Sequence, residues 1–218
     1  MIILCTHNNG GVGKTTLAVH VAGILMMREQ RTLLVDCDDQ ADFWRFHTGD
    51  LPTKPKDQEI YQPNNTIIWN KSRDPIESII KKSQYDHVVL DINSPLQNTV
   101  QTILGNDPDL ILVPINNSQK EKALLNLPRT LKVISNLEVR SGSNPQVIIV
   151  PLGISRNSID EVVNRLDYNN KPRRCKVFRE MNDCQDQMQR AIYRDRQYIW
   201  DYDDCEYLYD YFADLLDY

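Results

Sequence analysis

Gly10-Gly11-Val12-Gly13-Lys14-Thr15-Thr16 follows an apolar run, Ile2–Cys5, and opens a helical pattern, Lys14–Met27. A strand, a glycine-rich turn and a helix in this order hold phosphates, because glycines let backbone N–H groups point inward and the helix N-terminus adds positive potential. A lysine at the position of Lys14 reaches the β- and γ-phosphates, and the hydroxyl of Thr15 is placed to bind Mg²⁺. The stretch therefore predicts a P-loop that binds Mg-ATP.

Short apolar runs alternate with helical patterns along almost the whole chain. Most runs are continuously apolar and rich in β-branched residues, as expected for strands buried on both faces of a parallel sheet. The predicted strands are Ile2–Cys5, Thr32–Asp36, His87–Asp91, Leu110–Ile115 and Val147–Leu152. This alternation predicts an α/β fold with right-handed crossovers, in which helices flank a doubly wound, mostly parallel sheet. Residues 1–218 are most simply a single domain.

The helices are predicted from apolar spacing and from capping signals. Asp74-Pro75-Ile76-Glu77 places an N-cap, an N1 proline and an N3 glutamate in order, and Ser94-Pro95 opens another helix. The predicted helices are Lys14–Met27, 74–82, 94–104, Lys120–Leu137 and Ser158–Leu166. Residues 47–66 are rich in Pro, Asn, Asp and Lys, and we predict a long surface loop there.

Acidic residues stand at the carboxyl ends of two predicted strands, where ligands of such sheets bind. Asp91 ends the run Val88-Val89-Leu90 and can hold the Mg²⁺ water shell beside Thr15. Asp36 and Asp38 follow the second strand and can orient the metal or the attacking water. A capping carboxylate at Asp91 and loop solvation at Asp36 and Asp38 are the alternatives. The clustering of acids favours a cation between them, because the carboxylates would otherwise repel one another.

The composition, with 41% hydrophobic and 25% charged residues, is ordinary for a globular protein in water. The five cysteines have scattered spacings and no C-x-x-C pair, so neither a zinc site nor a disulfide framework is indicated. The chain opens without a secretory signal, and its apolar runs fall short of the roughly 20 residues that span a bilayer. We therefore expect reduced thiols and a cytoplasmic location.

Three motifs, in order, resemble those of the ParA/MinD family of ATPases with a deviant Walker motif, over about residues 1 to 160. They are Gly10 to Thr16, Asp36-Cys37-Asp38-Asp39-Gln40 and Tyr85-Asp86-His87-Val88-Val89-Leu90-Asp91. The resemblance implies an ATP-dependent homodimer with both nucleotides at its interface and a slow, partner-stimulated ATPase that moves or spaces a cargo. Carried over by position, Lys14 binds phosphate and Thr15 and Asp91 hold Mg²⁺. Asp38 activates the attacking water, and Asp36 supports it and the metal.

The sequence departs from the family pattern beside the phosphate motif. Asn8 stands where the strict P-loop has glycine, and Asp39 where the family's second motif usually has proline. The family's signature lysine, which crosses the dimer to the partner's nucleotide, falls on Asn9. Arg156 is a candidate to replace it, with an ordinary exposed loop arginine as the alternative. The predicted nucleotide-binding set is Asn9, Gly10, Gly11, Val12, Gly13, Lys14, Thr15, Thr16 and Arg156.

Within the family, the missing lysine, the short chain and the lack of an N-terminal DNA-binding domain make the sequence similar to the cyanobacterial McdA proteins. These proteins distribute carboxysomes over the nucleoid. The resemblance therefore implies a nucleoid-associated protein with carboxysomes as its cargo.

The C-terminal segment and a basic region point to different surfaces. All 25 Lys and Arg lie in residues 1–200, whereas residues 201–218 hold seven acids and an apolar helical stripe. Anionic lipid repels such an acidic face, so we expect a helix packed on the domain and no membrane binding. The basic region can contact DNA phosphates without reading bases, although a solvated charged face is the alternative. Its candidate residues are Arg173, Arg174, Lys176, Arg190, Arg194 and Arg196.

The leading interpretation is a positioning ATPase whose ATP-bound dimer coats DNA and whose McdB-like adaptor stimulates hydrolysis. Plasmid partition with a ParB-like adaptor uses the same chemistry and stays open. A metabolic ligase of the dethiobiotin-synthetase type would need a small-molecule carboxylate site, for which the sequence offers no candidate. A reductase like the nitrogenase iron protein would need a cysteine between Cys37 and Cys175, where the chain has none. A scaffold that binds ATP without hydrolysis is disfavoured by Asp38 but left open by Asn9.

Overall fold

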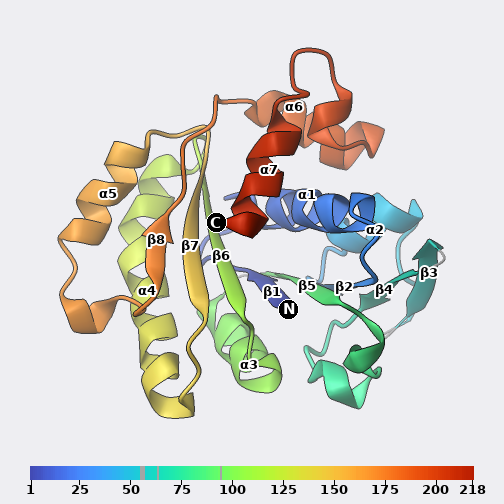
Figure 1. The fold of residues 1–218 in the computed structure, drawn as a ribbon, viewed down its shortest axis with the longest axis horizontal. Coiled ribbons are helices and arrows are strands. Elements are labelled where there is room, and N and C mark those ends of the chain that lie inside the picture. Colours follow the sequence, from blue (N-terminus) through green and yellow to red (C-terminus); the bar gives the residue numbers. More distant parts are fainter. Residues whose placement is uncertain (55–56, 63, 94) are drawn as a thin grey trace.

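The computed structural model describes residues 1–54, 57–62, 64–93 and 95–218 and contains an eight-stranded sheet with helices on both faces (Figure 1). The strand order is β3-β4-β2-β5-β1-β6-β7-β8, and all neighbouring strands run parallel except β3, which is antiparallel to β4 at one edge. The strands are β1 (Ile2–Cys5), β2 (Thr32–Cys37), β3 (Gln58–Gln62), β4 (Asn65–Trp69), β5 (His87–Ile92), β6 (Leu110–Asn116), β7 (Gln146–Leu152) and β8 (Cys175–Val177). The predicted doubly wound, mostly parallel α/β fold is confirmed.

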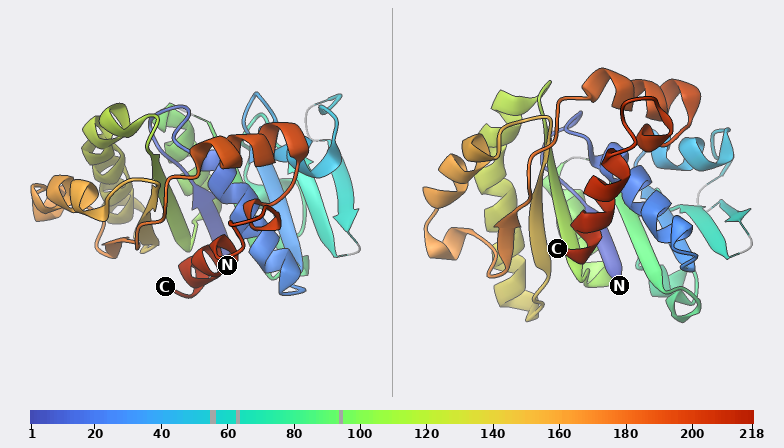
Figure 2. Two further views of the ribbon diagram at one scale, coloured as in Figure 1. Left: turned by 90° about the horizontal axis from the view of Figure 1, so that it is seen from above. Right: turned by 45° about the horizontal axis from the view of Figure 1, so that its top comes forward.

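The helices divide between the two faces of the sheet (Figure 2). One face carries α1, α2, α6 and α7, and the other carries α3, α4 and α5. The helices are α1 (Lys14–Met27), α2 (Asp42–Thr48), α3 (Leu96–Asn106), α4 (Lys120–Ser141), α5 (Arg156–Asn164), α6 (Gln185–Arg190) and α7 (Leu208–Asp217). Short helical turns lie at Ile76–Ser78, Lys82–Gln84, Tyr168–Asn170, Ala191–Asp195 and Ile199–Asp201.

The central strands are apolar throughout because each of their faces lies in a hydrophobic core. In β1, Ile3 and Cys5 pack on the α1 face, while Ile2 and Leu4 pack on the α3–α4 face. All four side chains are buried. A strand with two buried faces cannot alternate polar and apolar residues, which is why continuous apolar runs predicted these strands correctly.

The predicted surface loop over residues 47–66 is wrong in part, because the range holds β3 and the start of β4. β4 pairs in parallel with β2, and its residues Ile67 and Ile68 are buried in opposite cores. The sequence prediction missed β4 because its apolar run is short and the residues around it are rich in Pro and Asn. Residues 55–56 and 63 of the predicted loop lie outside the described part of the chain.

The helix predicted over residues 74–82 is also wrong, because the structure forms only short turns there. The Asp74 carboxylate accepts a hydrogen bond from Ser72 Oγ at 2.8 Å, and the Asp74 N–H donates to the side chain of Asn70. Asp74 therefore braces the preceding turn and does not cap a helix.

The other predicted helices are present with shifted ends. α3 begins at Leu96, and Ser94 lies outside the described residues. α4 continues four residues beyond Leu137 to Ser141. α5 begins at Arg156, before the predicted Ser158, because the Ser155 hydroxyl caps it by accepting the Asn157 N–H.

The acidic C-terminal segment forms a shorter helix than predicted, since residues 201–207 form turns. Its apolar side chains are buried against the face that carries α1, and two of its acidic ones pair with arginines of the body. Arg28 and Arg179 pair with Asp217 and Asp214 at 2.8 and 2.6 Å. Among the described residues, no helix is both long and apolar enough to cross a membrane.

A buried histidine joins the first turns of α1 to the C-terminal segment. His20 Nδ1 lies 2.6 Å from the Thr16 carbonyl oxygen, and His20 Nε2 accepts the Ile199 N–H at 3.0 Å. The ring also stacks on Phe212. Burial lowers the pKa of His20 to about 4, so the imidazole is neutral at pH 7, with its proton on Nδ1.

This network predicts an acid-sensitive contribution to stability. The unfolded chain protonates His20 near pH 6.5, but the folded chain does so only near pH 4, so acidification between these values favours unfolding. The resulting loss of folding stability reaches about 3 kcal/mol below pH 4. We expect His20→Gln to be less stable at pH 7.5 but to lose less further stability on acidification, as measured by denaturant unfolding from pH 8 to pH 4. Parallel pH profiles in both proteins would contradict this assignment.

Candidate nucleotide site

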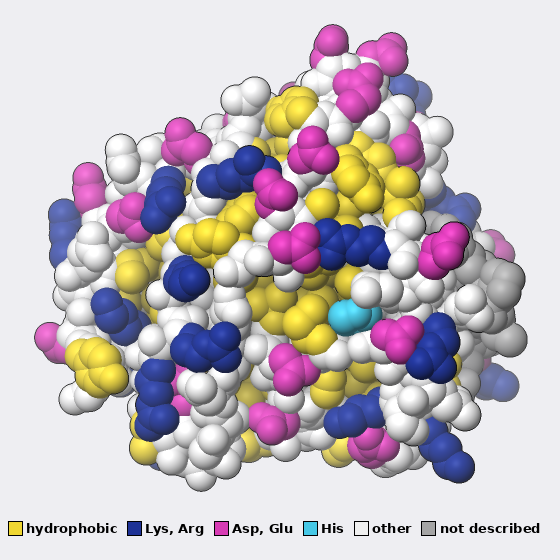
Figure 3. All heavy atoms as spheres, viewed as in Figure 1, with side chains coloured by type: hydrophobic (Ala, Val, Ile, Leu, Met, Phe, Trp, Pro, Cys, Tyr) yellow, Lys and Arg dark blue, Asp and Glu magenta, His cyan; other side chains and the backbone are white. Residues whose placement is uncertain are grey.

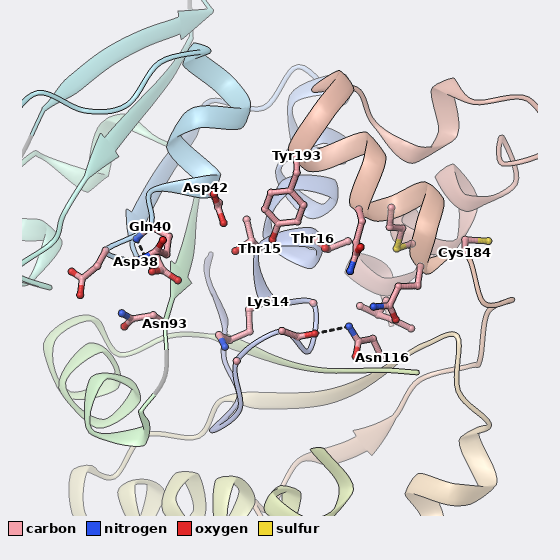
Figure 4. Close-up of a pocket in the computed structure, with 18 of the residues that line it drawn as sticks. Lys14, Thr15, Thr16, Asp38, Gln40, Asp42, Asn93, Asn116, Cys184 and Tyr193 are labelled. Atoms are coloured by element: carbon pink, nitrogen blue, oxygen red, sulfur yellow. Dashed lines mark hydrogen bonds between the residues drawn. The ribbon is translucent and has the colours of Figure 1, made fainter. Parts of the chain in front are cut away.

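A cavity of about 470 Å³ lies beyond the carboxyl ends of the central strands. The phosphate loop before α1 forms one wall, with Lys14, Thr15 and Thr16 at its end (Figure 4). Side chains of the β2–α2 segment line one side and those of the α6 region line the other. The motifs predicted at the strand ends are thus brought to one site.

The phosphate loop depends on a glycine directly before α1. Gly13 has φ of 101°, and a Cβ there would lie 2.7 Å from Leu152 Cδ1. The backbone conformation therefore disfavours a side chain, and a Cβ would also require Leu152 to shift. The loop is fixed from β6 as well, because Asn116 Nδ2 donates to the Gly11 carbonyl at 2.7 Å. The result is a tight turn that delivers the first N–H groups of α1 to the cavity.

Lys14 is buried and donates to the Asn9 carbonyl at 2.7 Å. Burial lowers the pKa of Lys14, although Asp91 and Asp38 oppose the shift. The Asn9 N–H in turn donates to His7 Nδ1 at 3.0 Å. Burial and the charge of Lys14 lower the pKa of His7 to about 4, so its neutral ring can accept this bond at pH 7. Lys14 is therefore held at the loop, in reach of a phosphate.

Thr15 and Asp91 have the geometry of a Mg²⁺ site. Thr15 Oγ1 donates to Asp91 Oδ2 at 2.6 Å, and Asp91 is fully buried. Its second oxygen, Oδ1, has no hydrogen-bond partner among the described residues. Burial is the main cause that raises the pKa of Asp91 to about 7, with the nearby acids adding to it. A buried carboxylate oxygen without a partner, next to a threonine hydroxyl, suits the water shell of a hard cation.

Asp36 sits beside Asp91 in the neighbouring strand, but its carboxylate is used within the protein. One oxygen accepts the Asp38 N–H and the other the Trp44 N–H, both at 2.8 Å. Asp36 is fully buried and is not among the described residues that line the cavity. The geometry therefore gives Asp36 a role in holding the loop and α2, and its predicted support of the metal stays a prediction.

Asp38 is one of the acidic residues of this loop that reach the cavity. It lines the cavity with Asp39, Gln40 and Asp42. One of its carboxylate oxygens accepts the Gln40 N–H at 2.9 Å, which orients the group.

The opposite side of the cavity is lined by residues that sequence reasoning missed. Met181, Cys184 and Met188 bring buried apolar side chains, and Gln185 and Gln189 bring amides. Tyr193 completes this side from a π-helical turn. The spacing of Met181, Cys184 and Met188 is a helical signal, but nothing in the sequence connects it with the phosphate loop far away in the chain. Apolar walls with nearby amides suit a planar base.

Not all predicted nucleotide residues reach the cavity. Asn9, Val12 and Arg156 are not among the described residues that line it. Arg156 Nε lies 3.3 Å from Asp160, and the Arg156 side chain borders a separate hollow beside Arg179 and Tyr218. Within one chain, the structure does not bring Arg156 to the nucleotide.

The predicted DNA-binding residues fall into two separate groups. The first group, at and before β8, has exposed basic side chains: Arg173, Arg174 and Lys176. The second follows α6, where Asp195 lies 2.7 Å from Arg190 and 3.9 Å from Arg194. Arg196 donates to the Phe46 carbonyl. Figure 3 shows basic side chains on the β8 side and acidic ones over the loop that precedes α7.

Known proteins resemble this chain both in sequence and in structure. A family model described as an AAA domain matches residues 1–84. The curated maintenance of carboxysome distribution protein A of Gloeobacter kilaueensis is 25% identical over 150 residues, which span 68% of this chain and 62% of that protein. The chromosome partitioning protein ParA of Myxococcus xanthus is 51% identical over 41 residues, 19% of this chain and 14% of that protein. The matches thus span less than two thirds of these curated relatives.

Solved structures extend the similarity over the whole chain. McdA of Cyanothece without ligand has a TM-score of 0.72 at 18% identity, with 99% of this chain and 98% of that chain covered. The fold is that of the ParA/MinD ATPases. A Cyanothece McdA variant solved as an ATP complex has a TM-score of 0.71, also at 18% identity, over 99% of this chain and 96% of that one. The predicted resemblance to the ParA/MinD family, and to McdA within it, is confirmed.

The Thr15–Asp91 pair of this ParA/MinD-like site gives a direct test of metal-dependent binding. Thr15→Ala removes the hydroxyl beside Asp91 and should weaken ATP binding in Mg²⁺ by about tenfold to a hundredfold, the range for a lost bond to a charged group. Binding in EDTA should change little. Thr15→Ser retains the hydroxyl and should bind as the wild type does. Calorimetric titration with both media measures this, and equal losses in Mg²⁺ and EDTA would refute the metal role.

Proposed function

We propose that this chain is an ATPase of the ParA/MinD type that dimerises with ATP, binds nucleoid DNA without sequence preference and positions a cargo. The observation that carries the proposal is the set of side chains around the phosphate loop. Lys14, Thr15 and Asp38 line one cavity, and Asp91, at a third strand end, accepts the bond from Thr15. The ATP complex of the similar Cyanothece McdA variant supports the choice of nucleotide.

The residues of the site divide the chemistry between them. Lys14 and the N–H groups at the start of α1 bind phosphate oxygens, and Thr15 and Asp91 hold the metal. Mg²⁺ bound with ATP would supply positive charge to the phosphates. The α6 side holds the base between Met181, Met188 and their neighbours. Asp38 orients the attacking water, a role supported by the bond that its carboxylate accepts from the Gln40 N–H.

Substitution of Asp38 tests this proposal most sharply. Asp38→Ala should retain ATP binding and ATP-dependent dimerisation but lower turnover by about a hundredfold or more, the typical size of a lost general base. The dimer should then remain trapped on DNA. Lys14→Ala is the matched control, since it should lose dimerisation as well. Phosphate release at the wild-type rate by Asp38→Ala would refute the role of Asp38 in hydrolysis. Sedimentation with ATP measures dimerisation and so distinguishes Asp38→Ala from Lys14→Ala.

DNA binding follows from the family resemblance and the two basic groups, and separate variants can locate it. Replacing Arg190 and Arg194 by alanine should weaken DNA retention and reduce the slope of log affinity against log salt by about 2, because each phosphate contact adds about 0.9. The double variant of Arg173 and Arg174 is the comparison. If the Arg190 and Arg194 variant keeps the wild-type salt slope, and the Arg173 and Arg174 variant has a reduced one, the DNA-binding surface lies at β8.

Carboxysomes are the proposed cargo, with an McdB-like adaptor that stimulates hydrolysis. The similarity to two McdA proteins in sequence and in structure supports this choice. Plasmid or chromosome partition is the second candidate, because the local match to Myxococcus ParA is stronger in identity, although it is short. Stimulation of turnover by an McdB-like protein, and not by a ParB-like one, would distinguish the two.

A further inference from the structure

The loop that carries Asp38 is held from outside by the last residue of β4 and the segment that follows it. Three consecutive carbonyl groups, those of Asp36, Cys37 and Asp38, each accept a hydrogen bond from it. The Asn70 N–H donates to Asp36 at 2.7 Å as the last bond of the β2–β4 ladder. The other two donors are side chains.

Trp69 supplies the bond closest to the carboxylate. Its indole Nε1 donates to the Asp38 carbonyl at 2.9 Å. The Asp38 N–H is already bound by the Asp36 carboxylate at 2.8 Å. Both polar groups of the Asp38 backbone are therefore fixed, one from β2 and one from β4. Since the backbone is fixed, the Asp38 side chain has only its own rotamers to explore.

Arg73 supplies the bond to the middle carbonyl, with Nη1 at 3.1 Å from the Cys37 oxygen. Its guanidinium is turned inward, since Nε is buried and has no partner among the described residues. Arg73 has φ of 57°, which is uncommon for a residue with a side chain. Asn70 braces this turn, because its side chain bonds both the N–H and the carbonyl of Asp74. The uncommon backbone conformation of Arg73 and its inward guanidinium together favour the bond to the Cys37 carbonyl.

We propose that Trp69 and Arg73 are positioning residues that hold the Asp38 carboxylate in place for ATP hydrolysis. The inference rests on the proposed role of Asp38, but neither residue lines the cavity in the described part of the chain. Their effect is therefore on turnover and not on nucleotide binding. Loss of either donor frees a carbonyl of the loop and lets the carboxylate move, which costs catalysis because the water must be oriented to within a fraction of an ångström.

Steady-state hydrolysis by the full chain tests the proposal with Trp69→Phe and Arg73→Met. Each should lower kcat by about fivefold to tenfold, the size of one net hydrogen bond, with KM for ATP unchanged. Arg73→Lys retains a donor and should recover part of the loss. Lys81→Met is the matched control, because it removes an exposed charge farther along the same segment and should leave kcat unchanged. Trp69 and Arg73 are tested separately, so the failure of one variant to fold leaves the other informative.

The same substitutions in an Asp38→Asn background separate positioning from a structural role. If Trp69 and Arg73 act through Asp38, they should lower kcat no further once that carboxylate is gone. An equal further loss in this background overturns the proposal, as does an increase of KM with kcat unchanged. Wild-type turnover of Asp38→Asn alone would instead refute the role of Asp38, so the two failures can be told apart.

Discussion

The whole site depends on the left-handed backbone at Gly13, directly before α1. This conformation lets the phosphate loop turn into α1, so that the first N–H groups of the helix face the cavity. Thr15, in the first turn of α1, then meets the buried carboxylate of Asp91. A side chain at position 13 would strain this turn, which is why the position suits glycine.

Two buried groups extend this arrangement to the rest of the molecule. Asp36 binds the N–H groups of Asp38 and Trp44, and so joins the β2 loop to α2. His20 binds Thr16 and Ile199, and so joins α1 to the C-terminal segment. Both are fully buried, and both satisfy backbone groups that would otherwise be costly to bury. The acidic side of the cavity is thereby fixed to α2, and α1 is fixed to the C-terminal segment.

The sequence predicted what local patterns can determine. Continuous apolar runs form most of β1, β5, β6 and β7, and the P-loop is a contiguous motif. Their local sequence is therefore sufficient to predict them. β4 begins with two polar residues and β8 has only three residues, so neither gives such a signal, and their pairing with β2 and β7 is set by the sheet. The helix expected at residue 74 failed because the same Asp74 has a second use in the turn after Asn70. Met188 and Arg73 reach the site or its loop only through the tertiary fold, which no local pattern encodes.

The charges of the site explain why it suits a nucleotide that arrives with its own cation. Of the described residues that line the cavity, Lys14 alone is cationic, whereas Asp38, Asp39 and Asp42 are acidic and Asp91 lies beneath them. The pKa of Asp91 is raised to about 7, chiefly by burial and further by its acidic neighbours. A triphosphate would meet repulsion from these carboxylates, and a divalent cation held by Thr15 and Asp91 would offset that repulsion.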